Sequence, residues 1–135
     1  MKDNPYRPEI FGTFVLAPLV LALETWRRWG ELLSPAALDD WVIFVSAMIV
    51  AAKLARRDAS APVLWVFVCG GAWFLFLLST WGSIYFFDQP DPSGVPVAGV
   101  IAFKAVGFTL ISVASWRGLL RLRAADPYER YGDRP

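Results

Sequence analysis

The sequence predicts an all-helical integral membrane protein, built as a bundle of four transmembrane helices with both termini in the cytoplasm. Residues 59–87 contain no charged side chain, and roughly 20 apolar residues suffice to cross a bilayer. The chain of 135 residues is 56% hydrophobic, with a mean hydropathy of +0.45, which is more apolar than a soluble domain of this size. Lysine and arginine are also unevenly divided between successive loops, as is typical of proteins with several spans.

Four apolar segments are separated by polar connections. The spans are expected at residues 10–29, 40–56, 61–87 and 95–120, and together they form one transmembrane domain over residues 10–120. Residues 1–9 form a polar cytoplasmic segment, in which Pro5 and Pro8 discourage helix until about Glu9. The acids of this segment argue against a cleaved signal peptide, so the first span is expected to be permanent. Residues 121–135 form a polar cytoplasmic tail that is expected to be disordered.

The second span begins near two adjacent acids. Ser34 and Pro35 are expected to open a short interfacial helix, and Asp39 or Asp40 is expected to cap the span that follows. Consecutive helix positions point about 100° apart, so the two carboxylates are poorly placed to share one ligand. We therefore interpret them as a helix cap rather than as a cation site or an acid–base pair.

Small residues predict which faces of the spans pack together. In the second span, Ala47, Ala51 and Ala55 share a face, so Ala51→Phe is expected to disrupt packing and Val50→Phe to be tolerated. In the third span, residues 69–72 form a patch of small side chains that would let another backbone approach. In the fourth span, a packing seam is expected at Ala98, Ala102, Ala105, Thr109 and Ser112, with Lys104 off the seam.

The distribution of basic residues sets the predicted orientation. Four spans place both termini and the middle loop on one side, together with Lys2, Arg7, Lys53, Arg56, Arg57, Arg117, Arg121, Arg123, Arg130 and Arg134. The opposite side has only Arg27 and Arg28 and is rich in acids. Lysine and arginine favour the cytoplasmic side. The expected location is therefore a bacterial inner membrane, with both termini inside.

Three charged residues, Glu24, Asp40 and Lys104, are candidates for a polar cluster within the membrane. Lys104 is the only ionisable group well inside a span, roughly 10 Å below the outer surface, and Glu24 lies at a similar depth of roughly 7 Å. Asp40 is placed above the alanine face of the second span. Three interpretations are open: Lys104 extends to the outer headgroups, it pairs with Glu24 or Asp40, or the group is a working ion or proton site.

No residue pattern assigns a reaction, a substrate or a cofactor. Histidine is absent and Cys69 is the single cysteine, so neither a histidine-based active site nor a thiolate metal site is expected. A net charge of +1 gives no reason to expect nucleic acid as a partner. We expect no enzyme, but a non-catalytic bundle in the lipid bilayer that assembles with itself or with a larger membrane complex. The alternative is a small ion or solute transporter or channel that uses Glu24, Asp40 and Lys104.

The orientation can be tested with reporter fusions. Fusions after Asp58 and after Pro135 should both report a cytoplasmic position, and a fusion within residues 89–93 should report an external one, because the basic residues gather on the first side. An external position for the C-terminus would contradict the arrangement with four spans.

Overall fold

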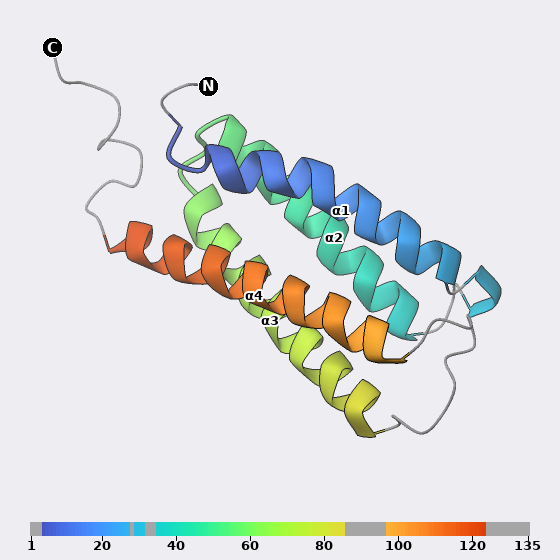
Figure 1. Cartoon of the computed structure of the whole chain (residues 1–135). Coiled ribbons are helices and arrows are strands. Elements are labelled where there is room, and N and C mark those ends of the chain that lie inside the picture. Colours follow the sequence, from blue (N-terminus) through green and yellow to red (C-terminus); the bar gives the residue numbers. More distant parts are fainter. Residues whose placement is uncertain (1–3, 28, 32–34, 86–96, 124–135) are drawn as a thin grey trace, which may run out of the picture.

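The chain folds into long helices, drawn in Figure 1. The computed structural model describes residues 4–27, 29–31, 35–85 and 97–123. Within these residues there is no strand, and the elements are α1 (Arg7–Arg27), the short 3-10 turn η1 (Trp29–Glu31), α2 (Pro35–Ala55), α3 (Ala61–Tyr85) and α4 (Val97–Leu122). The prediction of an all-helical fold is confirmed.

Three of the helices are long and apolar enough to cross a bilayer. The apolar stretches are Arg7–Arg27, Ala61–Leu78 and Ala98–Leu122. α2 has a comparable length, 21 residues or about 31 Å. It carries Asp39, Asp40 and Lys53, however, and it does not qualify as a span by composition. The part of the chain that the structure describes therefore supports a membrane protein with three apolar spanning helices.

Two helices begin earlier than the sequence suggests. α1 begins at Arg7, so Pro8 lies in its first turn, where a missing N–H breaks no bond within the helix. α2 runs without a break from Pro35 to Ala55, so Pro35 opens this long helix and not a separate short one. Asp39 and Asp40 lie inside this helix, beyond its first turn. The prediction that one of them caps the second span is therefore wrong.

The helices run alternately up and down, as Figure 1 shows. α1 packs on α2, α2 on α3, and α3 on α4, whereas α1 and α4 make no comparable backbone contact among the described residues. We call the junction between these two helices the α1–α4 seam. The end of the bundle where α1 begins and α4 finishes is called the Glu9 end, and the opposite end is called the Glu24 end.

The best-buried apolar core lies toward the Glu9 end. It consists of Tyr6, Ile10, Val50, Leu54, Ala61, Trp65 and Cys69. Ala51 is fully buried, as its alanine face predicts. Val50 belongs to the same core, so the expectation that Val50→Phe is tolerated is wrong. The outward-facing neighbour is Ile49, which is exposed.

α3 and α4 approach each other at two glycines of α4. A Cβ atom at Gly107 would lie only 2.7 Å from Cε1 of Phe76, closer than such atoms come in proteins. A Cβ atom at Gly118 would lie 3.1 Å from Cγ2 of Val66 and 3.3 Å from Cδ1 of the Trp65 ring. Rings from α3 therefore occupy the space that these glycines leave open, and this contact decides which face of α4 turns inward.

The alanine seam predicted for the fourth span faces outward instead. Ala98, Ala102, Ala105 and Thr109 are all exposed. Of the predicted seam, only Ser112 bonds to α3 among the described residues, by accepting a 3.0 Å hydrogen bond from Nε1 of Trp73. Lys104 lies on the buried side. The prediction failed because glycine and aromatic residues, rather than alanines, form the close contact.

The small patch of the third span is only partly used in packing. Cys69 and Ala72 are buried. A Cβ atom at Gly71 would meet Cδ1 of Ile43 in α2 at 3.6 Å, whereas one at Gly70 would meet nothing within 4 Å. The close approach that the sequence suggested is therefore limited to an ordinary contact at Gly71.

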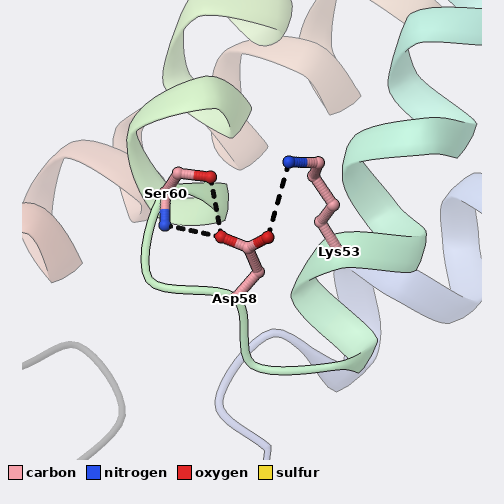
Figure 2. Close-up of polar contacts among 3 residues, drawn as sticks. All are labelled: Lys53, Asp58 and Ser60. Atoms are coloured by element: carbon pink, nitrogen blue, oxygen red, sulfur yellow. Dashed lines mark hydrogen bonds and ion pairs between the residues drawn. The ribbon is translucent and has the colours of Figure 1, made fainter.

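The turn between α2 and α3 is held by a dense set of hydrogen bonds. Arg57 has a φ of 57°, and the N–H of Asp58 donates to the carbonyl of Lys53, as in a Schellman C-cap. The carboxylate of Asp58 accepts hydrogen bonds from Oγ and N of Ser60 at 2.7 and 2.9 Å, and lies 3.4 Å from Nζ of Lys53 (Figure 2). The bonds from Ser60, together with the Lys53 ammonium, lower the pKa of Asp58. This turn fixes α2 and α3 as an antiparallel pair.

Candidate functional site

All four helices line a small cavity toward the Glu24 end. Its volume is about 40 Å³, and its lining residues are Val20, Glu24, Arg27, Asp40, Ile43, Phe44, Leu75, Phe76, Phe103 and Lys104. The structure thus brings Glu24, Asp40 and Lys104, the three residues singled out from the sequence, to one place. The structure adds Arg27 to this group; in the sequence analysis Arg27 was counted only among the basic residues of the outer side.

Glu24 forms an ion pair within its own helix. Oε2 of Glu24 accepts hydrogen bonds from Nε and Nη2 of Arg27 at 3.0 and 2.7 Å. Both side chains are mostly buried, with 17% and 18% exposed. The spacing of three residues places the two groups on one face of α1. Arg27 is therefore one partner of the carboxylate that the sequence suggested for Lys104.

Lys104 is buried rather than extended to the surface. Only 9% of the residue is exposed, and it lines the cavity beside Phe103. A lysine that extends to the headgroups keeps its ammonium in a wet region, so this burial favours the interpretation in which Lys104 interacts with the polar groups around the cavity.

The charges around the cavity balance. Glu24 and Asp40 supply two negative charges, and Arg27 and Lys104 supply two positive ones. A volume of about 40 Å³ has room for roughly three water molecules. Among the described residues there is no group of three or more histidine, cysteine or acidic side chains that could hold a metal ion. The arrangement can hold water between charged groups, but it presents no excess charge to an ion.

A second polar cluster closes the Glu9 end of the bundle. Oε1 of Glu9 in α1 lies 3.0 Å from Nε of Arg117 and 2.9 Å from Nη1 of Arg121, both in α4. The Glu9 side chain is only 5% exposed. Two arginines thus share one carboxylate oxygen across the α1–α4 seam, where backbone packing is weak.

The segment before α1 belongs to this cluster. Nδ2 of Asn4 donates a 2.8 Å hydrogen bond to the carbonyl of Leu54 near the end of α2, and Oδ1 of Asn4 accepts one from the N–H of Tyr6. The guanidinium of Arg121 lies 4.5 Å from the centre of the Tyr6 ring. Burial raises the pKa of Tyr6, so its hydroxyl remains protonated at neutral pH.

Sequence reasoning missed the Glu9 cluster completely. The sequence places Glu9 in the polar N-terminal segment, residues 1–9, and uses Arg117 and Arg121 only as evidence for the orientation of the fourth span. One available signal was their spacing: Arg117 and Arg121 are four residues apart and so share a helix face.

Comparisons with protein families, with curated proteins and with solved structures found no match, so both polar clusters must be interpreted from their own geometry.

The coupling of Lys104 to the acids of the cavity can be measured with a double-mutant cycle. Lys104→Met and Glu24→Gln should each destabilise the protein by about 1–3 kcal/mol, because each leaves opposite charge unbalanced in a buried site. The double mutant should recover much of this loss. Thermal stability of the single and double mutants in one detergent gives the coupling.

Asp39→Asn is the matched control, because Asp39 is exposed one position before Asp40. Its effect should simply add to that of Lys104→Met. Additive effects of Glu24→Gln and Lys104→Met on stability would mean that the two residues are not coupled. A Lys104→Met variant as stable as the wild-type protein would indicate a lysine that extends to the headgroups. Full stability of both single mutants with loss of a cellular phenotype would indicate a transport site.

Proposed function

We propose that this chain is a non-catalytic bundle of four transmembrane helices in a bacterial inner membrane, with both termini in the cytoplasm, and that it assembles with itself or with a larger membrane complex. The proposal joins two parts, the topology and the role. Each part is supported by different contacts.

The position of α2 beside α1 supports a fourth span. The hydrogen bond from Asn4 to the carbonyl of Leu54 ties the end of α2 to the start of α1. At the opposite end of the bundle, Asp40 lines the cavity together with Glu24 and Arg27 of α1. α2 therefore covers the same height as α1 in the opposite direction. If α1 crosses the bilayer, α2 crosses it too, with its charges near its two ends.

The charge at the two ends of the bundle supports the orientation. The described residues at the Glu9 end include the basic side chains Arg7, Lys53, Arg56, Arg57, Arg117, Arg121 and Arg123 and the acids Glu9 and Asp58. The Glu24 end has Arg27 and Lys104 against Glu24, Asp39 and Asp40. An excess of arginine and lysine marks the cytoplasmic side, which assigns the Glu9 end to the cytoplasm.

The outward face of α4 is the observation that carries the proposed assembly. Ala98, Ala102, Ala105 and Thr109 recur at intervals of four, three and four residues and are all exposed. In membranes, exposed small residues at such spacing allow a second helix to approach closely. Among the described residues, α4 also packs closely on one helix, α3. A further helix, from another copy or another membrane protein, fits this face.

A small ion or solute transporter or channel that uses Glu24, Asp40 and Lys104 is the second candidate. The observation that favours it is the cavity, because three helices bring these side chains to one place. The balanced charges and the volume of about 40 Å³ weigh against it, since a conducting path needs a continuous polar lining. We therefore prefer the role in assembly, in which these charges hold the helices together.

Cysteine cross-linking tests the assembly. Cys69 is the only cysteine, so Cys69→Ala provides a background without thiols. In that background, Ala105→Cys in native membranes should form a disulfide with a second copy, or with a membrane partner, because the small face brings helices into contact. The adduct is read as a mass shift on a non-reducing gel.

Phe67→Cys is the matched control, because Phe67 is strongly exposed on α3 and lies outside the small face. Its cross-linking should be several times weaker. Equal cross-linking at both positions would mean random collision in the membrane and would contradict the proposed interface.

A further inference from the structure

The two arginines at the Glu9 end carry one positive charge more than Glu9 balances, and both lie at the same oxygen, Oε1, while Oε2 of Glu9 has no hydrogen-bond partner among the described residues. Both bond to the same oxygen of one carboxylate, so the three side chains together carry a net charge of +1. Each guanidinium has five N–H donors; Arg121 donates one of them to Glu9 from Nη1, and Arg117 forms an ion pair with Glu9 through Nε. This part of the α1–α4 seam is therefore suited to a second anion.

The arginine pair is open at Arg117, whereas the Arg121 side chain is mostly buried. The Arg117 side chain is 45% exposed, whereas Glu9 beneath it is 5% exposed. Trp116, the preceding residue, is also exposed, and tryptophan at a helix end is typical of the headgroup region. An anion at this depth can reach Arg117 without displacing Glu9.

From the arginines toward the Glu24 end, the α1–α4 seam is apolar and exposed. Leu16 lies seven residues after Glu9, and Leu110 lies seven residues before Arg117, so helix geometry places both along the seam. They are 44% and 52% exposed. An acyl chain that lies along these leucines would extend from the arginine pair toward the Glu24 end.

We propose that Arg117 and Arg121 bind the phosphate of one anionic phospholipid, whose acyl chain lies along the α1–α4 seam. The phosphate supplies the negative charge that balances the net +1 of Glu9 and the two arginines, and guanidinium groups are well suited to phosphate oxygens. Basic sites between helices on the cytoplasmic side bind lipid headgroups in this way. The proposal needs the helices to lie in a bilayer, but it does not need the assembly proposed above.

The test is native mass spectrometry of the full-length protein in a neutral detergent. Phosphatidylglycerol and phosphatidylcholine with the same acyl chains are added separately. We expect the protein to retain one phosphatidylglycerol and to become more heat-stable, and to show neither effect with phosphatidylcholine. Equal retention of the two lipids would overturn the proposal.

Arg117→Gln should weaken the retention of phosphatidylglycerol about five- to tenfold, because it removes one cation from the phosphate. Arg56→Gln is the matched control, since Arg56 is exposed at the same end of the bundle but outside the seam, and it should leave retention unchanged. An equal loss in both variants would mean diffuse attraction to a basic surface and would overturn the site.

Arg117→Lys provides a second test that does not depend on the result for Arg117→Gln alone. It keeps the positive charge, so it should retain phosphatidylglycerol more strongly than Arg117→Gln does, whereas retention no better than that of Arg117→Gln would contradict the proposal. Inorganic phosphate is the last probe. If it stabilises the wild-type protein as much as phosphatidylglycerol does, the site binds free anions and the assignment to a lipid is wrong.

Discussion

The ion pairs of Glu9 are the interaction on which the closure of this bundle depends. The consecutive helices are held by backbone packing, with glycines admitting aromatic rings between α3 and α4. α1 and α4 have no comparable packing among the described residues, and Glu9 joins them through its ion pairs with Arg117 and Arg121 at 3.0 and 2.9 Å. A carboxylate at 5% exposure is costly to bury unless it is paired. The same pairing that neutralises Glu9 therefore also joins α1 to α4.

At the Glu24 end of the seam, partly buried acidic side chains are again accompanied by basic ones. There, Glu24 and Arg27 of α1 share a cavity with Lys104 of α4, so acidic and basic groups face each other across the seam at two heights. Between these heights the seam is lined by exposed leucines. This arrangement explains why charged side chains within an apolar protein can be structural. It also leaves an apolar path beside the arginine pair, which is where we place the lipid.

The sequence was sufficient for the helices but not for their contacts. Charge-free runs and prolines located the helical segments, because a chain in lipid must satisfy its own backbone hydrogen bonds. The inward face of α4 could not be predicted, because the alanines and Gly107 are all small, and only the position of the Phe76 ring decides between them. The candidate residues Glu24, Asp40 and Lys104 do line one cavity. Glu9 was missed because its partners are more than a hundred residues away, and spacing along the chain carries no information on such pairs.

The most direct test of this account is the distance between α1 and α4 in a lipid bilayer. Spin labels at Phe11→Cys and Val113→Cys in a Cys69→Ala chain report that distance by pulsed electron paramagnetic resonance, and a pair at Phe67→Cys and Val113→Cys reports α3 and α4. If Glu9 closes the seam, Glu9→Gln should lengthen and broaden the first distance and leave the second unchanged. An unchanged distance between α1 and α4 would contradict the account, because it would mean that packing on α2 alone holds α1 in place.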